Sequence, residues 1–187
     1  MARVVAADAC VLINLLATRR PAELLRALGC KLVTTPQAAA QVRFIAGPLD
    51  EEGGATRIPV DPGVLTVAGL LDVRAVPAEG FDLFVRCAVD LDDADASAIA
   101  LSSALSVALA TDDAAERRVA AREAPGVKLV RTLSLIREAA GAMGLEGEPL
   151  VELARNLRAG GNFLPPRGDP DGDWFGQLVA GAESPPI

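Results

Sequence analysis

The sequence predicts an α/β fold, a three-layer α/β/α sandwich with a central, mostly parallel sheet. Short apolar runs, of the length of buried strands, alternate along the 187 residues with longer segments of helical pattern. This alternation is typical of a parallel sheet that is covered by helices on both faces. The sequence contains no internal repeat, and its length suits one domain with a single core.

The first part of the chain is punctuated by prolines and a glycine at helix boundaries. Pro21 and Pro36 suit the first turn of a helix, and Gly29 suits the residue after a helix end. Residues 46–63 are rich in turn-forming residues and predict an exposed connection. The elements expected before that connection are strands at 3–7 and 31–34 and helices at 10–18, 21–29 and 36–45.

The second part begins with an ambiguous segment, "VLTVAGLLDVRAV" (64–76), which fits the period of a strand and that of a helix equally well. Beyond it the apolar pattern is clearer. The elements expected there are helices at 81–89, 94–105, 113–123, 133–143 and 149–160 and strands at 106–110 and 127–131.

The chain is expected to form one domain over residues 1–160, followed by a C-terminal extension at 161–187. The extension is rich in Gly, Pro and Asp, a composition that predicts loose structure. Its aromatic residues Phe163, Trp174 and Phe175 are the groups able to hold it against the domain.

Composition restricts the chemistry that is available. The chain has no histidine, and Cys10, Cys30 and Cys87 are widely spaced among apolar neighbours. We expect three buried thiols in a reducing, cytoplasmic environment. Without histidine or a cysteine pair, a zinc site of nitrogen and sulfur ligands is excluded, so a metal would be a hard cation held by oxygen.

The net charge of −7 disfavours tight non-specific binding to a polyanion. A metal-bridged phosphate substrate stays possible, because the cation supplies the positive charge. No apolar run reaches the roughly 18 residues of a membrane helix, and Asp8 interrupts the apolar N-terminal stretch, so we expect neither a membrane span nor a signal peptide.

Acidic residues mark the ends of two predicted strands. Asp8 follows the first strand, Asp112 and Asp113 follow the strand at 106–110, and Asp95 begins the helix that leads into that strand. Ligands collect outside the carboxyl ends of the strands in an open α/β sheet. If the two strands are neighbours, these carboxylates converge, and a divalent cation would relieve their repulsion.

Each of these residues also has a purely structural explanation. Asp8 could cap the first helix, and Asp113 with Glu116 has the spacing of a capping box. Both explanations stay open for Asp112 and Asp113. Joint placement at the strand ends favours a site over separate caps.

Three arginines, Arg117, Arg118 and Arg122, form a stripe on the helix that follows these aspartates. A solvated helix face is the default explanation for such a stripe. Contact with the phosphates of a nucleic acid is the alternative.

Read together, three segments resemble a PIN domain, the small metal-dependent nuclease fold of VapC-type toxins. "VVAADACVLINLLA" looks like the family's opening strand, aspartate and helix, with Asp8 as first ligand and Asn14 near the site. "LDDADASAIALSSAL" is similar to its central segment, with Asp95 where glutamate is more usual. "VALATDDAAERRVA" looks like its third element, with Asp112 as ligand and Asp113 beside it. The resemblance covers residues 3–131 and, more loosely, the helices to 160.

The resemblance implies a ribonuclease with Mg²⁺ or Mn²⁺ bound by Asp8, Asp95 and Asp112, and with Asp113 as a further catalytic residue. It also implies an RNA substrate, a homodimer and a small antitoxin partner. The chain departs from the family at Gln41, where a second acidic residue is common. Asp50, Glu51 or Glu52 could replace that carboxylate from the following loop.

Two alternatives remain beside the nuclease. Gln41 and the acidic net charge suit a catalytically degenerate PIN domain that serves as a binding or assembly module. An aspartyl-phosphate enzyme with Asp8 as nucleophile is a weaker alternative, because Cys10 stands where such enzymes carry a second aspartate.

Overall fold

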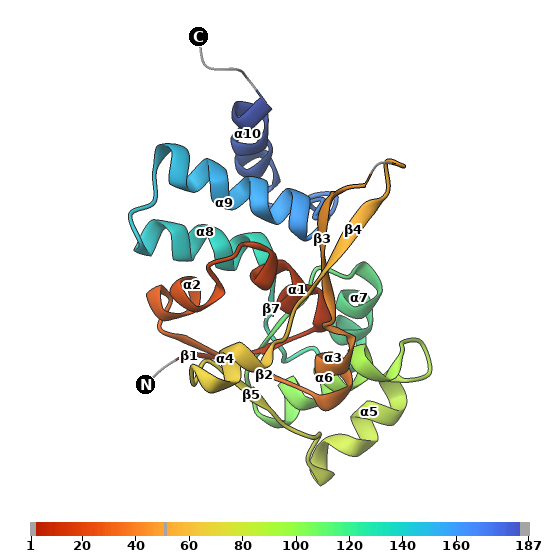
Figure 1. Cartoon of the computed structure of the whole chain (residues 1–187). Helices are drawn as coiled ribbons and strands as arrows, with labels where there is room; N and C mark the ends of the chain where they lie inside the picture. Colours follow the sequence, from red (N-terminus) through yellow and green to blue (C-terminus); the bar gives the residue numbers. More distant parts are fainter. Residues whose placement is uncertain (1–2, 51, 184–187) are drawn as a thin grey trace.

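The computed structural model describes residues 3–50 and 52–183, and Figure 1 shows their arrangement. Its centre is a five-stranded sheet in which every pairing is parallel. The strands follow one another across the sheet in the order β5 (Leu71–Val73), β2 (Cys30–Thr34), β1 (Arg3–Ala7), β6 (Ala108–Ala110) and β7 (Leu129–Val130). The predicted α/β/α sandwich with a parallel sheet is confirmed.

Helices cover both faces of this sheet, since successive strand side chains point to opposite sides. Leu32 belongs to one buried cluster and its neighbour Val33 to the other. The Leu32 side is covered by α1 (Ala9–Ala17), α2 (Pro21–Ala27), α8 (Thr132–Ala142) and α9 (Gly147–Gly160). The Val33 side is covered by α5 (Phe81–Cys87), α6 (Asp93–Ala104) and α7 (Ala114–Glu123).

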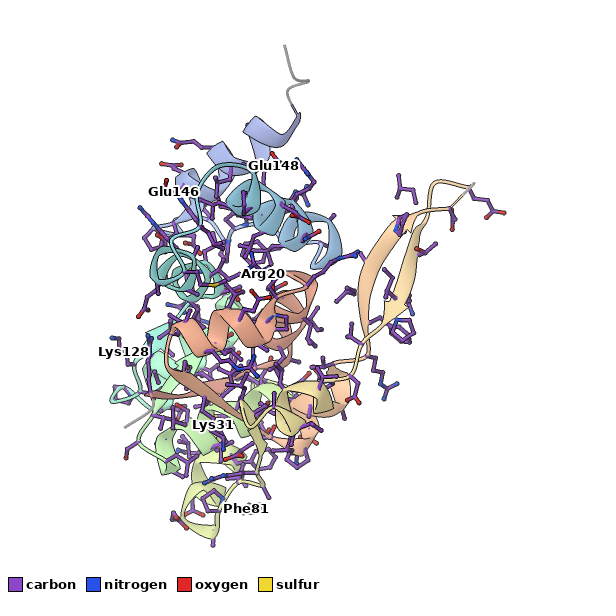
Figure 2. All side chains as sticks on the ribbon, turned by 60° about the vertical axis from the view of Figure 1, so that its left-hand side comes forward. Arg20, Lys31, Phe81, Lys128, Glu146 and Glu148 are labelled. Atoms are coloured by element: carbon purple, nitrogen blue, oxygen red, sulfur yellow. The ribbon has the colours of Figure 1, made fainter. Side chains whose placement is uncertain are left out.

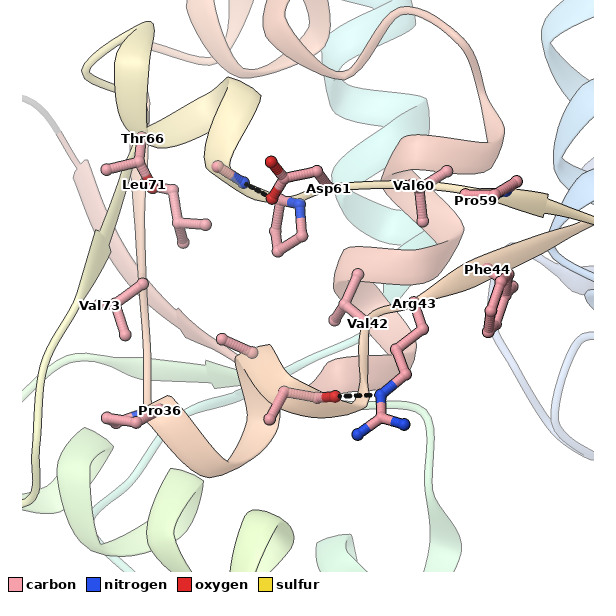
Figure 3. Close-up of a pocket in the computed structure, with 14 residues that line it drawn as sticks. Pro36, Val42, Arg43, Phe44, Pro59, Val60, Asp61, Thr66, Leu71 and Val73 are labelled. Atoms are coloured by element: carbon pink, nitrogen blue, oxygen red, sulfur yellow. Dashed lines mark hydrogen bonds between the residues drawn. The ribbon is translucent and has the colours of Figure 1, made fainter.

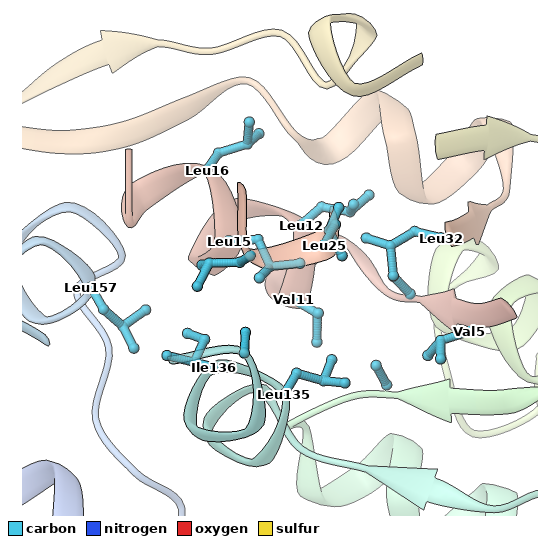
Figure 4. Packing of buried hydrophobic residues seen from close by; sticks show 14 of the residues in the cluster. Val5, Val11, Leu12, Leu15, Leu16, Leu25, Leu32, Leu135, Ile136 and Leu157 are labelled. Carbon is cyan, nitrogen blue, oxygen red and sulfur yellow. The ribbon is translucent and has the colours of Figure 1, made fainter. Parts of the chain in front are cut away.

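The larger core lies between α1, α2, α8 and the sheet (Figure 4). Leu12, Leu15, Leu32 and Leu135 are each at most 1% exposed. Complete burial of such a side chain contributes about 1.5–3 kcal/mol. This packing fixes α1 directly behind β1, so the residue that joins them has a defined position.

The chain changes direction across the sheet at β1, because β2 lies on one side of it and β6 on the other. The backbone N–H of Asp8 donates to the carbonyl of Ala110 at 3.2 Å, which ties the ends of β1 and β6 together. Such a switch point opens a crevice at the carboxyl ends of the two strands. The strand ends that carry Asp8 and Asp112 are therefore neighbours.

A β-hairpin replaces the connection expected at 46–63. Helix α3 (Pro36–Gln41) stops before 45, and β3 (Phe44–Leu49) pairs antiparallel with β4 (Ala55–Pro59). The hairpin stands out from the domain in Figure 1. The predicted helix over 36–45 is wrong at its end, because its last residues, including Phe44 and Ile45, are strand formers with a partner strand within reach.

The ambiguous segment at 64–76 contains both kinds of structure, with helix α4 (Gly63–Val67) followed by strand β5. Gly69, at φ +72°, provides the turn between them. A short 3₁₀ turn, η1 (Ala78–Gly80), then leads into α5.

The C-terminal segment is more ordered than its composition predicts. Helix α10 (Gly172–Glu183) packs on α9, and Phe163 and Phe175 are buried in the main core with their rings edge to face, 5.6 Å apart. The expectation of a loosely structured extension is wrong for residues 161–183. Residues 184–187 lie outside the described part of the chain.

Within residues 3–50 and 52–183, no helix combines the length and the apolar character needed to cross a membrane.

Candidate functional site

Asp8 lies at the junction of β1 and α1, and its side chain is 2% exposed. One carboxylate oxygen, Oδ1, accepts a hydrogen bond from the backbone N–H of Val11 at 2.6 Å and so caps α1. The other, Oδ2, is buried without a hydrogen-bond partner among the described residues. Asp8 is therefore a helix cap that also presents a free buried carboxylate oxygen.

Asp112 follows β6 and has a similar division of roles. Its Oδ1 accepts from the backbone N–H of Thr132 at 3.1 Å, at the start of α8. Its Oδ2 is buried and has no hydrogen-bond partner in the described part of the chain. Asp112 does not cap the helix that follows it, so its second oxygen is free for a ligand.

Asp113 is the N-cap of α7, and its Oδ1 accepts from the backbone N–H of Glu116 at 2.7 Å. The structural explanation for this residue is thus confirmed. The Asp113 side chain is exposed, in contrast to that of Asp112. Its role in a site stays a prediction.

Glu116 is the acidic residue that the sequence analysis treated only as part of a capping box. It is 0% exposed, and both of its carboxylate oxygens are buried without a hydrogen-bond partner among the described residues. A signal for this burial exists in the sequence, because Glu116, Val119 and Ala120 share one helix face and all three are buried. A carboxylate on the apolar stripe of a helix needs a partner or a proton.

The buried carboxylates disturb one another's ionisation. Burial raises the pKa of Asp8 to about 6, and the charge of Asp112 adds to the shift. Burial, followed by the charge of Asp8, raises the pKa of Glu116 far above its usual range. Without a cation, Asp8 and Glu116 affect each other's titration, and Glu116 carries a proton at neutral pH.

Asp95 lies in the first turn of α6, where Asp92 is the N-cap. Partial burial, followed by the charges of Asp92 and Asp113, raises the pKa of Asp95 to about 6. Asp95 and Asp113 come from elements far apart in the sequence. The charge of Asp113 reaches Asp95 because α6 and α7 are in contact.

The first turn of α1 is the place where these carboxylates meet. Burial raises the pKa of the Cys10 thiol to about 12, and the next causes are the charges of Asp8, Asp95, Glu116 and Asp112. Cys10 is exposed, whereas Cys30 and Cys87 are buried. The expectation of three buried thiols is therefore wrong for Cys10. The reason is that Cys10 directly follows the site residue Asp8 and lines the cavity beside it.

Among the described residues, no three acidic, cysteine or histidine side chains are arranged so that they could hold one metal ion. The donor chemistry nevertheless fits a hard divalent cation. Four of the buried carboxylate oxygens without hydrogen-bond partners in the described part of the chain belong to this site: Oδ2 of Asp8, Oδ2 of Asp112 and both oxygens of Glu116. Carboxylate oxygen is the preferred ligand of Mg²⁺ and Mn²⁺.

A cavity of about 350 Å³ opens beside these carboxylates. Its lining includes Cys10, Asn14 and Asp112 on one side and the segment at 161–166 on the other. A Cβ at Gly161 would come within 2.7 Å of Asn14 Oδ1, so only glycine lets this segment pass so close. The C-terminal segment is therefore a wall of the site.

Gln41 lies at the end of α3 and is exposed. Its Nε2 donates to Oδ2 of Asp92 at 3.2 Å, which places its amide at the N-terminus of α6, one turn from Asp95. Of the possible replacement carboxylates, Asp50 accepts from backbone N–H groups within the hairpin, including that of Gly54 at 2.7 Å, and Glu51 lies outside the described residues.

A larger cavity, of about 700 Å³, lies at the base of the hairpin (Figure 3). Its lining is mostly apolar, and its two charged side chains form hydrogen bonds with backbone groups two or three residues away. Arg43 Nε donates to the carbonyl of Ala40 at 3.0 Å, and Asp61 Oδ1 accepts from Gly63 N–H at 2.7 Å. None of the predicted acidic site residues lines this cavity.

Comparison with known families agrees with this geometry. A family model described as a PIN domain matches residues 4–166, which include every carboxylate of the site. The chain belongs to the PIN-domain family. PIN domains form a nuclease-like superfamily and generally use divalent metal ions. No match was found among curated proteins.

The raised pKa values predict that the metal-free protein loses stability as pH rises. Asp8 and Asp95 have pKa values of about 6, against 3.8 for an ordinary aspartate, so their contribution is complete below pH 3.8 and is lost through pH 6. Glu116 extends the decline to higher pH. Urea unfolding at pH 4.5 and 7.5 in chelator should show this loss.

The matched variant is Glu116→Gln, which keeps the shape and removes the charge. At pH 7.5 without metal, we expect it to be more stable than wild type by about 1–3 kcal/mol. At pH 4.5, where Glu116 is protonated, the difference should shrink. Carboxylates outside the site titrate equally in both proteins. A difference in unfolding free energy that is the same at the two pH values would therefore contradict the burial cost assigned to Glu116 and its neighbour Asp8.

Proposed function

We propose that this chain is a metal-dependent endoribonuclease resembling VapC-type toxins. The observation that carries the proposal is the set of unpaired, buried carboxylate oxygens of Asp8, Asp112 and Glu116 at the switch point of a PIN domain. Together with Asp95 they would hold Mg²⁺ or Mn²⁺. Asp113, which caps α7 and lies exposed beside Asp95, would orient a water molecule.

A bound divalent ion would lower the pKa of a water molecule and stabilise negative charge on the scissile phosphate. The chain's own groups prepare this site. The N–H of Val11 donates to one oxygen of Asp8, and the N–H of Thr132 donates to one oxygen of Asp112. These bonds fix the direction of the second oxygen of each carboxylate. On binding a cation, Glu116 would lose its proton to solvent.

A catalytically degenerate PIN domain is the second candidate. It is favoured by the neutral Gln41 and by the absence, among the described residues, of three side chains arranged around one ion position. Such a module would keep the fold and bind a partner without cleavage. Metal affinity separates the two candidates.

The proposal extends to partners. By analogy with VapC-type toxins, a small antitoxin would restrain the nuclease, and the active form would be a cytoplasmic homodimer. Co-expression with the neighbouring reading frame and size determination in solution would test these parts independently of cleavage.

The direct test of the nuclease is incubation of labelled single-stranded RNA with the purified full chain. Cleavage is expected with Mn²⁺ or Mg²⁺ and not with chelator. If RNA stays intact at all metal concentrations while the protein binds Mn²⁺, the degenerate module is the better description.

The neutral Gln41 predicts weak metal binding, and Gln41→Glu should strengthen it. The new carboxylate adds negative charge at the N-terminus of α6, beside the turn that carries Asp95. We expect a gain of about 1–3 kcal/mol in metal binding, or roughly 5- to 150-fold in affinity, net of repulsion from Asp92. Titration calorimetry with Mn²⁺ measures the gain.

Cleavage by the Gln41→Glu variant should exceed that of wild type most at low Mg²⁺, where occupancy limits the rate. Gln37→Glu, on the exposed first turn of the same helix, is the matched control and should leave metal affinity unchanged. Equal affinities for all three proteins would mean that position 41 does not face the metal.

A further inference from the structure

A second cavity, of about 350 Å³, runs along the sheet-edge strand β7 and carries mostly positive charge. Its charged lining comes from Arg3, Arg117, Lys128, Arg131 and Glu138. Figure 2 shows Lys128 on this edge of the molecule. The nuclease proposal uses none of these side chains.

The charges in this cavity are incompletely balanced. Arg3 is paired with Glu138 at 2.9 Å, and Arg131 Nε lies 3.9 Å from Asp169 Oδ2, which is too long for a hydrogen bond. Lys128 has no ion pair within residues 3–50 and 52–183. The lining thus carries four cationic side chains and one carboxylate, Glu138, in a chain whose net charge is −7. Asp112 and Asp169, which do not line the cavity, also act on Arg117.

Arg131 presents a donor without a partner. Its Nη1 is buried and makes no hydrogen bond to any described residue. Arg117 lies close by, and after burial the charge of Arg131 is the next cause that lowers the Arg117 pKa. The charges of Asp112 and Asp169 offset part of this repulsion, and Arg131 Nη1 still has no hydrogen-bond acceptor among the described residues.

One end of the cavity is adjacent in sequence to a residue that contacts Asp112. Arg131 immediately precedes Thr132, whose N–H donates to Asp112. Lys128 and Arg131 are three residues apart on an extended segment, or about 10 Å at the rise of a strand. A positively charged groove of that length can follow the backbone of a single strand, the substrate proposed above.

We infer that the cavity along β7 binds the phosphate backbone of RNA, with Lys128 and Arg131 contacting phosphates next to the one at the carboxylate site. This inference rests on the proposed function, because it makes the strand edge the continuation of the same substrate path. Phosphate contacts of this kind position a nucleic acid without reading its sequence.

Lys128→Gln and Arg131→Gln test the inference. Arg117 is spared, because its Nη1 bonds to the carbonyls of Thr111 and Val130 and holds the strand ends. Arg155→Gln, on α9, removes an equal charge from an exposed pair with Glu148 and is the matched control. The measurement is fluorescence anisotropy with a labelled oligouridylate in chelator, so that no cleavage intervenes, after thermal melts show that each variant is folded.

Each cavity variant should weaken RNA binding roughly three- to tenfold and reduce the slope of log K against log salt by about 0.7, the value for one phosphate contact on a single strand. Arg155→Gln should bind nearly as wild type does. Wild-type affinity and slope in both cavity variants would overturn the inference. The inference would also be overturned if the two cavity variants bound RNA normally and lost affinity only for oligoglutamate. The cavity would then be a surface for an acidic protein segment.

Cleavage by the same preparations separates this inference from the nuclease proposal. If wild type cleaves RNA and both cavity variants bind it normally, the nuclease stands and the phosphate path fails. If the variants bind RNA more weakly but wild type cleaves none, the phosphate path stands and the nuclease fails. A wild type that binds no RNA contradicts both.

Discussion

Asp112→Asn should reduce metal-dependent cleavage of single-stranded RNA by roughly 100-fold or more, beyond the 10–100-fold typical of outer-shell partners of a metal. Asparagine keeps an oxygen that can accept from Thr132 N–H at the start of α8, so the local structure should survive. What is lost is the charge on the buried Oδ2, which has no other partner among the described residues. Initial rates at saturating Mn²⁺ measure the effect.

Two controls make this result specific. Asp90→Asn removes an exposed carboxylate that pairs with Arg122, and it should leave the rate unchanged. Asp113→Asn keeps a good helix cap, so it should lose less activity than Asp112→Asn. If Asp112→Asn cleaves at the wild-type rate, Asp112 is not part of a catalytic site.

Millimolar Mn²⁺ should raise the melting temperature of the wild-type protein. Cation binding to the native state relieves repulsion among Asp8, Asp112 and Glu116, whose pKa values are raised by burial and by one another. At 100 times Kd, a ligand adds about 2.7 kcal/mol. For a chain of this length that corresponds to roughly 5–10 °C, measurable by calorimetry or circular dichroism.

Glu116→Gln is the informative variant for this stabilisation. Its metal-free form should melt above wild type at pH 7.5, because glutamine need not take up a proton on burial as the Glu116 carboxylate does. Its gain with Mn²⁺ should be smaller. Glu123→Gln, on the same helix but paired with Arg86 and Arg122, is the control and should keep the full gain. If wild type melts alike with and without Mn²⁺, the degenerate module becomes the better account.

Much of the fold was predictable because the apolar runs of the sequence coincide with strands that pair in the sheet. β1, β2 and β6 are short apolar runs next to clear helices, and their order places Asp8 and Asp112 at one edge. Asp8 illustrates why two explanations could both hold: one carboxylate oxygen caps α1, and the other stays free. Sequence alone does not separate roles that belong to different atoms of one side chain.

The errors came from contacts between distant segments. β3 is stabilised by pairing with β4, and Phe163 by the core and by Phe175, so neither has a strong local signal. Glu116 was missed for a related reason. Its spacing from Asp113 fits a capping box, and only the packing of α7 against the sheet turns its carboxylate inward.

The central claim is that Asp8, Asp112 and Glu116 hold a divalent cation, and diffraction from crystals soaked in Mn²⁺ tests it most directly. Anomalous scattering locates manganese independently of any assumption about the site. The account predicts a peak within about 2–2.6 Å of carboxylate oxygens of Asp8 and Asp112, as expected for oxygen ligands of such cations. A fully soaked crystal with no peak there, or with manganese bound only elsewhere, would contradict it.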